Sequence, residues 1–242
     1  GWQYRDWVGR FYPPELPARL RFAHYASVFD TVELNTTFYR LPQLRTVERW
    51  AADAPDGFLY ATKLGAFGSH RMKLRDPGGW LANHVDRVEA LGAHAGPTVV
   101  QLPPRWRRDV GRLRAFLDVA RTWSPIRWAV ELRDPSWVHD DVFAALEEAG
   151  AALVLHDLLD QPWLRTTSWT YLRLHGPAAT STPYRGSYGP RRLAAIAERV
   201  RPWLAEGGDV YAYCNNDVDA AAIGDAVLLR KLLSTGSIQP NG

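Results

Sequence analysis

The 242-residue chain is short of cysteine, methionine and lysine, with one, one and three of these residues respectively. Because Cys214 is the only cysteine, the chain forms no internal disulfide and no metal site built from several thiolates. No apolar run approaches the roughly 20 residues of a membrane-spanning helix, and no basic-then-apolar leader opens the sequence. We therefore expect no membrane association, and the reducing cytoplasm is the simplest location.

In other respects the composition is that of a globular protein, with 46% hydrophobic and 23% charged residues. It excludes a disordered chain, a collagen and a coiled coil. The length suits two small domains or one α/β barrel, which runs to about 250 residues. The net charge of +3 is mild, but only three of the 29 basic residues are lysine. An excess of arginine favours bidentate recognition of phosphate or carboxylate, although codon bias in the genome explains the same excess.

Segments rich in β-formers alternate with segments of helical periodicity along the chain. Seven strands are predicted, at Thr31–Tyr39, Phe58–Leu64, Thr98–Leu102, Arg127–Leu132, Ala152–His156, Thr170–His175 and Asp209–Asn215. The intervening helices are predicted at Leu44–Ala54, Leu81–Ala93, Asp109–Thr122, Asp140–Ala149, Pro190–Glu206 and Ala220–Leu233. This alternation indicates βαβ units and a parallel sheet.

A barrel fits the strand count better than a doubly wound sheet, because no G-x-G-x-x-G motif follows any strand. We expect an eighth strand to precede Gly1, which opens a loop-like aromatic stretch. The predicted fold is therefore α/β, a single (β/α)8 TIM-type barrel domain over residues 1–242 whose first strand comes before Gly1.

Polar residues recur where the predicted strands end, in pairs two positions apart. They are Glu33 and Asn35, Glu131 and Arg133, Arg173 and His175, the row Tyr213, Asn215 and Asp217, and the single residues Lys63, Gln101, His156 and Asp157. Residues two positions apart on a strand share a face, so both members of a pair can point into the barrel. Barrel active sites lie at the carboxyl ends of the strands. One such pair is explained by the solvation of the loop that follows the strand. Polar residues at the ends of all seven predicted strands instead indicate a functional rim.

Two glutamates lead the catalytic candidates. Glu33 and Glu131 suit a general acid and base, with His175 as a third catalytic residue, but both glutamates serve equally well as counter-ions to neighbouring cations. A divalent metal is the alternative cofactor, with ligands from the set Glu131, His156, Asp157 and His175. Cys214 lies between inward-facing neighbours, so it should point outward and take no nucleophilic role.

An anionic, phosphorylated ligand is the predicted partner, with nucleic acid as one form of it. The residues expected to bind it are Asn35, Lys63, Gln101, Arg133, Arg173, Tyr184, Arg185, Tyr188, Asn215 and Asn216. Two long loops, at Gly65–Gly79 and Gly176–Gly189, carry further basic residues and are long enough to act as binding loops. Asp109, which follows Arg105, Arg107 and Arg108, is expected to cap the next helix.

Six ordered motifs carry a family resemblance. They are VELNTTFYRLP, VVQLPP, VELRDPSW, YLRLHG, YRGSY and YAYCNND. Together with the opening GWQYRDWVGRFYPP, they resemble the YecE-like family, a bacterial and archaeal domain of unknown function. The resemblance runs from Gly1 to about Leu233 and implies a TIM-type barrel with a further strand before Gly1. Its barrels are distantly similar to the xylose isomerase and endonuclease IV group, which binds divalent metals through Glu, Asp and His. Asp134 stands where the family commonly has His, and Cys214 where it commonly has Phe.

Three functions remain open at this stage. The first is an enzyme that acts on a phosphorylated or nucleic-acid-like substrate, with metal-assisted phosphoester hydrolysis as the specific form. The second is a glycosidase that uses Glu33 and Glu131. The third is a non-catalytic binder of nucleic acid or of a phosphorylated metabolite, whose affinity for nucleic acid should fall steeply with salt. The enzyme is narrowly favoured, because a binder needs no buried pair of carboxylates.

Overall fold

A computed structural model describes residues 1–123 and 125–234. The chain divides into two compact units, which we describe separately. Unit 1 contains Gly1–Gln3 and Glu15–Val154, and unit 2 contains Tyr4–Pro14 and Leu155–Gly242. The prediction of one domain over residues 1–242 stays a prediction.

The described residues form seven strands in an α/β fold. They are β1 (Thr31–Leu34), β2 (Leu59–Lys63), β3 (Ala95–Gln101), β4 (Trp128–Glu131), β5 (Ala152–His156), β6 (Thr170–Leu174) and β7 (Val210–Cys214). Strand order in the sheet is chain order, and the pairing is parallel. Register places Gln101 beside Glu131 and Arg173 beside Tyr213. The parallel α/β fold is confirmed, whereas the eighth strand is not among the described residues and stays a prediction.

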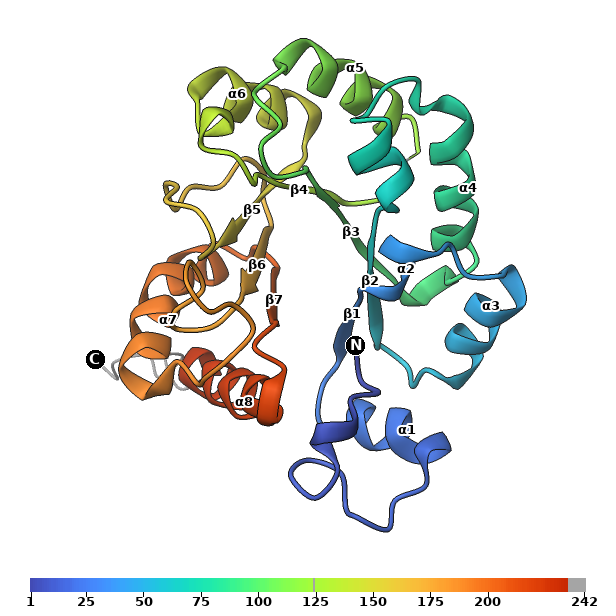
Figure 1. Ribbon diagram of the computed structural model, residues 1–242, viewed down its shortest axis with the longest axis vertical. Coiled ribbons are helices and arrows are strands. Elements are labelled where there is room, and N and C mark those ends of the chain that lie inside the picture. Colours follow the sequence, from blue (N-terminus) through green and yellow to red (C-terminus); the bar gives the residue numbers. More distant parts are fainter. Residues whose placement is uncertain (124, 235–242) are drawn as a thin grey trace. The chain divides into compact units, whose positions relative to one another are not determined.

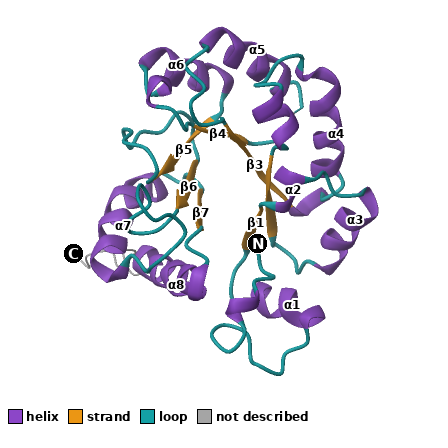
Figure 2. Ribbon diagram, viewed as in Figure 1, coloured by secondary structure: helices purple, strands orange, loops and turns teal. Residues whose placement is uncertain are grey.

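Helices follow the strands in both units, as Figures 1 and 2 show. Unit 1 contains α1 (Arg21–Ala26), α2 (Thr36–Tyr39), α3 (Leu44–Asp53), α4 (Pro77–Glu89), α5 (Val110–Ala120) and α6 (Asp140–Ala149). Within it, α4 packs against α3 and α5, and α5 packs against α6. Unit 2 contains α7 (Gly189–Ala205) and α8 (Ala221–Ser234), which pack against each other and against β7.

Short helical turns join several of these elements. They are η1 (Arg5–Trp7), η2 (Ala18–Leu20), η3 (Phe67–Arg71), η4 (Gly92–His94), η5 (Pro135–Trp137) and η6 (Val218–Ala220). Two predicted helix ends are confirmed by their caps. Asp109 accepts a hydrogen bond from the backbone N–H of Arg112 at the start of α5, and Gly150 ends α6 with a φ of 64°.

The predicted first strand, Thr31–Tyr39, is too long. β1 ends at Leu34 and a helical turn, α2, follows from Thr36. The Thr37 hydroxyl contacts the carbonyl oxygens of Leu34 at 2.8 Å and of Lys63 at 2.7 Å. It also accepts a hydrogen bond from the Lys63 N–H. The Thr37 side chain thus takes up backbone groups of Leu34 and Lys63 that would otherwise pair between the two strands. The segment TTFY therefore forms a helical turn, although its β-branched and aromatic residues favour a strand.

The outward faces of the strands pack against the helices. In unit 2, Leu174 on β6 packs with Leu193 and Leu229 from the two helices, and Cys214 lies against this cluster. Its predicted outward orientation is therefore confirmed. Burial, with nearby carboxylates led by Asp225, raises the pKa of the Cys214 thiol, which makes it a poor nucleophile. In the part of the chain that the structure describes, no helix has the length and apolar character needed to cross a bilayer.

Candidate functional site

In unit 1, a lysine and a glutamine meet at the ends of neighbouring strands. The Lys63 ammonium donates a hydrogen bond of 2.7 Å to Oε1 of Gln101, and both side chains are buried. The ammonium also lies 4.2 Å from the centre of the Phe38 ring, a favourable cation–π distance. Both residues were predicted to bind ligand, and the structure brings them together.

Glu131 and Arg133, predicted to form a pair from their spacing, make an ion pair at the end of β4. Nη1 of Arg133 donates to Oε1 of Glu131 at 2.8 Å, and the Glu131 side chain is 0% exposed. Arg133 is half-buried, and this is its one hydrogen bond among the described residues. A guanidinium has five N–H donors, so four of them remain available to a ligand.

His70, in the loop after β2, reports the charge around these residues. Burial lowers its pKa, and the positive charges of Lys63 and Arg133 lower it further, while Glu131 opposes them. The ring packs edge-on against Phe38 and lies within hydrogen-bond distance of the Ser69 hydroxyl. We call Lys63, His70, Gln101, Glu131 and Arg133 the strand-end cluster. Because two cations act on one imidazole, the cluster has a net positive potential beside His70.

Unit 2 holds a connected chain of polar groups built on Asp157. Oδ1 of Asp157 lies 3.0 Å from Nδ1 of His175, and its two oxygens also accept from the His175 backbone N–H. The Tyr188 hydroxyl donates to the other carboxylate oxygen and accepts from the Gly176 N–H at 2.7 Å. Burial alone would raise the pKa of Asp157, but the hydrogen bonds from His175 and Tyr188 hold it below its usual range.

This bonding fixes how His175 carries its proton. The ionised Asp157 accepts from Nδ1, so a neutral His175 bears its hydrogen there and keeps the Nε2 lone pair. An imidazole oriented in this way by a carboxylate is the arrangement of a general base. His175 is 1% exposed, and its ring contacts those of His156 and Tyr184. The Tyr188 pKa is raised by burial and by Asp157, so its phenol stays protonated.

The predicted metal ligands of unit 2 do not fit a metal ion as they are arranged. Nδ1 of His156 accepts the Leu158 backbone N–H at 3.1 Å, so its neutral ring carries hydrogen on Nε2. Both Asp157 oxygens are already hydrogen-bonded to His175 or Tyr188, which leaves the Nε2 lone pair of His175 as a single isolated ligand. Among residues 1–123 and 125–234, no group of three or more His, Cys, Asp or Glu side chains is placed to share a metal.

Asp225, which the sequence analysis did not single out, anchors the loop after β6. This buried carboxylate on α8 accepts from the Ser187 hydroxyl, the Tyr188 N–H at 3.0 Å and the Asn216 side-chain amide at 2.7 Å. The same amide donates to the Gly186 carbonyl. Tyr188 and Asn216, both predicted to bind ligand, are thus held in a network of structural bonds. A lone acid within the apolar stretch AAIGDAVLL was the available signal.

The remaining predicted site residues are distributed over the two units. Glu33 on β1 is buried, Asn35 is half-buried before α2, and Arg173 on β6 is buried, whereas Arg185 is exposed. Asn215 is buried at the end of β7, and its Nδ2 has no partner among the described residues. Asp134, where the YecE-like pattern commonly has His, accepts from the N–H and hydroxyl of Ser136. These bonds lower the pKa of Asp134, whose side chain caps the first turn of η5.

Backbone strain is confined to one kind of segment. The non-glycine residues with positive φ in the described chain all lie between the end of a strand and the next α-helix; they are Lys73, Leu74, Asp76, Arg105, Tyr184 and, within η6, Asp219 and Ala220. Each such conformation costs about 1–2 kcal/mol. Strain of this kind collects at functional sites, where the surroundings over-determine the backbone. The loops at the carboxyl ends of the strands are therefore the best candidates for the functional face of each unit.

Comparisons with known proteins agree with the YecE-like resemblance. A profile of the family described as "Protein of unknown function DUF72" matches residues 1–241. The UPF0759 protein YecE of Escherichia coli K12 is 32% identical over 114 residues, which cover 47% of this chain and 41% of that protein. The UPF0759 protein YunF of Bacillus subtilis is 32% identical over 76 residues, or 31% of this chain and 26% of that protein. The matched segments thus span less than half of each curated relative.

Solved structures match a larger share of the chain. A DUF72 family protein from Thermotoga maritima superimposes with a TM-score of 0.84 at 25% identity, covering 97% of this chain and 96% of the other. A DUF72 family protein from Enterococcus faecalis gives 0.75 at 20% identity, covering 87% of each. The second likeness shows the fold alone. Neither description states a substrate or a reaction.

Proposed function

We propose that this chain, which belongs to the DUF72 family of proteins of unknown function, binds a phosphorylated ligand at the strand-end cluster of unit 1. We further propose that unit 2, taken by itself, carries a separate activity, the hydrolysis of a phosphoester with His175 as the base. Arg133 carries the first proposal, because it is half-buried at a strand end and donates one of its five N–H groups to Glu131. A planar donor fork with several donors available recognises phosphate oxygens bidentately.

The charges beside Arg133 support an anionic ligand. Lys63 and Arg133 both depress the pKa of His70, so their fields overlap at one place. The buried Glu131 offsets one positive charge and orients the guanidinium through a 2.8 Å bond. Gln101 adds an amide that can donate to a phosphate oxygen while its Oε1 accepts from Lys63.

The loops of unit 1 extend this positive charge beyond the cluster. After β2 come Arg71, Lys73 and Arg75, and after β3 come Arg105, Arg107 and Arg108. Lys73 and Arg105 are also among the residues with positive φ. Basic side chains on loops of fixed conformation suit a ligand with more than one phosphate, such as a nucleic acid strand.

His175 is the residue we propose for proton transfer in unit 2. Its Nδ1 is held by the ionised Asp157, so Nε2 is available to take a proton from water or a hydroxyl group. Tyr188 donates to the Asp157 carboxylate oxygen that does not bond to Nδ1 of His175 and so holds the carboxylate in place. No step involves a metal ion, since His156, Asp157 and His175 are not arranged to hold one.

Binding is tested by fluorescence anisotropy with a labelled single-stranded 12-nucleotide DNA over a range of salt concentrations. Each contact to a phosphate adds about −0.7 to the slope of log K against log salt for a single strand. We expect Arg133→Met and Lys63→Met each to remove about that much. Arg45→Met, on the exposed surface of α3, is the matched loss of charge and should leave the slope unchanged. Equal slopes in all three variants would refute the site.

Hydrolysis is tested with 4-nitrophenyl phosphate and bis(4-nitrophenyl) phosphate, in chelator and with added Mg²⁺ or Mn²⁺. We expect turnover that falls at least about a hundredfold in His175→Gln, as general-base catalysis contributes 10²–10⁴-fold. Normal turnover in His175→Gln would reject the proposed base. Salt-dependent binding without any turnover would instead make the protein a binder.

A further inference from the structure

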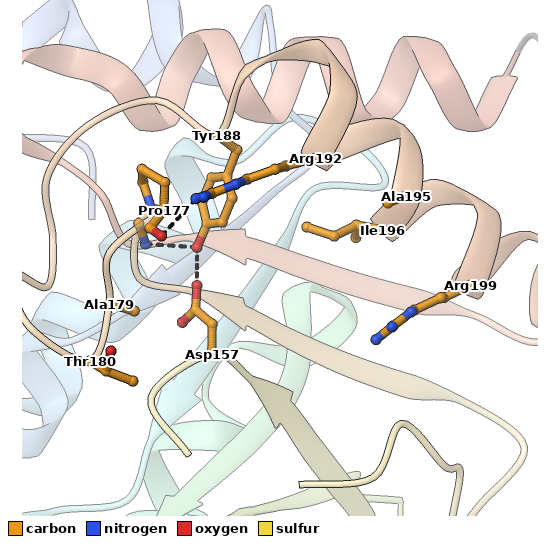
Figure 3. Close-up of a pocket in the computed structure, with 10 residues that line it drawn as sticks. Asp157, Pro177, Ala179, Thr180, Tyr188, Arg192, Ala195, Ile196 and Arg199 are labelled. Atoms are coloured by element: carbon orange, nitrogen blue, oxygen red, sulfur yellow. Dashed lines mark hydrogen bonds between the residues drawn. The ribbon is translucent and has the colours of Figure 1, made fainter. Parts of the chain in front are cut away.

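A pocket of about 340 Å³ lies in unit 2 beside α7, and the strand-end cluster has no part in it. Its α7 wall contains Arg192, Ala195, Ile196 and Arg199, whose spacing of three, four and seven places them on one helix face. Asp157 and the loop after β6 form the opposite wall. Figure 3 shows both arginines extending from α7 on the side that faces Asp157.

The two arginines of this wall have no carboxylate partner among the described residues. Nη1 of Arg192 donates a hydrogen bond of 2.7 Å to the Pro177 carbonyl oxygen, which fixes the guanidinium against the loop after β6. Arg199 makes no hydrogen bond or ion pair in the described chain, and its guanidinium lies 5.1 Å from the centre of the Trp163 ring. A cation–π contact positions a guanidinium without using its N–H donors.

The other lining groups limit what can bind. Asp157 is ionised because its pKa is lowered, and both its oxygens already accept hydrogen bonds, so it repels a second negative charge. Ala195 and Ile196 offer an apolar patch between the arginines, and Thr180 adds a hydroxyl group opposite them. The volume is at the small end of the range for pockets that bind small molecules, about 300–1,000 Å³.

We propose that this α7 pocket binds a small organic acid. Its single anionic group, a carboxylate or a phosphate, contacts Arg199, and its apolar body of about one ring packs against Ala195 and Ile196. The uncharged end of the ligand faces Asp157. The proposal rests on unit 2 alone and stands or falls independently of the strand-end cluster.

Four probes separate charge from apolar contact. Benzoate and phenyl phosphate carry the anionic group on a ring, benzamide is the neutral isostere of benzoate, and acetate lacks the ring. Binding is followed by calorimetry and by shifts of the Ala179, Thr180 and Ile196 amides in ¹H–¹⁵N spectra. We expect benzoate or phenyl phosphate to bind with Kd of about 1 mM or tighter, and benzamide and acetate about tenfold more weakly. The stronger of the two ring anions identifies the preferred acid.

Variants of α7 provide the controls. Arg199→Met should weaken the preferred anion about tenfold, while Arg199→Lys should retain most of the affinity. Arg191→Met removes the same charge from an exposed neighbour that does not line the pocket, and it should change Kd less than twofold. Amide shifts away from α7 show that each variant is folded. The proposal is overturned if neither ring anion shifts these amides at about 10 mM, if benzamide binds as tightly as benzoate, or if Arg191→Met matches Arg199→Met.

Discussion

His84 makes the stability of this protein depend on pH in a calculable way. It lies on the buried side of α4, is 3% exposed, and makes one hydrogen-bond contact, 3.3 Å from its Nε2 to the Thr62 hydroxyl. Nδ1 has no partner among the described residues. Burial, helped by the charge of Arg87, lowers the pKa of His84 from 6.5 to about 4. A proton on this imidazole would be a buried charge without a counter-ion.

The unfolded chain binds this proton near pH 6.5, whereas the folded protein binds it only near pH 4. Between these values the unfolded state holds more protons, so the folded state is fully stable above pH 6.5 and loses stability as the pH falls. At pH 5, about 1.5 units below the unfolded pKa, the loss is about 2 kcal/mol. Below pH 4 it reaches about 3 kcal/mol.

Urea unfolding at about pH 8 and pH 5 measures this loss, with His84→Gln as the control. Glutamine keeps a group that can bond to Thr62 but does not titrate, so every other acidic and basic group cancels in the comparison. We expect the wild-type protein to lose about 2 kcal/mol more than the variant between the two pH values. Equal losses in the two proteins would show that His84 is protonated in the fold or exposed to water, and would refute the reasoning.

Three further predictions concern unit 2. In Asp225→Asn, an NH₂ donor replaces one of the two carboxylate oxygens, which accept the Ser187 hydroxyl on one side and two N–H groups on the other. The free energy of unfolding, measured in urea, should fall by about 2 kcal/mol, and a fall of less than about 0.5 kcal/mol would contradict the network. Gly176→Ala places a Cβ 2.5 Å from the Arg185 carbonyl oxygen at a φ of 118°, so proteases should cut the loop after β6 much faster; unchanged cleavage would argue against this close approach. Tyr188→Phe removes a donor to Asp157, so the Asp157 pKa should rise in a ¹³C carboxyl titration; an unchanged value would remove Tyr188 from the polar chain.

Local features of the sequence predicted much of the fold and part of the site. The alternation of strand and helix patterns is set by backbone periodicity, which depends on near neighbours, and the parallel fold is confirmed. The spacing of two between Glu131 and Arg133 predicted a pair, and the two side chains meet at 2.8 Å. Both rest on geometry that a few consecutive residues determine.

Features that depend on distant groups were missed. β1 ends early because the Thr37 hydroxyl meets the Lys63 backbone, 26 residues further on. The α7 pocket lies between the face of α7 that carries Arg192 and the loop after β6. Because this loop has no periodic sequence pattern, its position against α7 could not be predicted. In each case residue types are visible in the sequence, but the partner that decides their role is not.

The composition of unit 2 has a consequence for synthesis on the ribosome. Its first segment, Tyr4–Pro14, contacts the end of the chain through η1 and η6, and Nε1 of Trp7 donates to the Asp217 carbonyl 210 residues later. Translation at about 5–20 residues per second takes roughly 10–40 s to cover that interval. During this time Trp7 and Tyr12, both buried in the finished fold, have no partner at the far end of the chain. This aromatic segment thus leaves the ribosome long before its partner on η6 is made, which makes it a natural binding site for a chaperone.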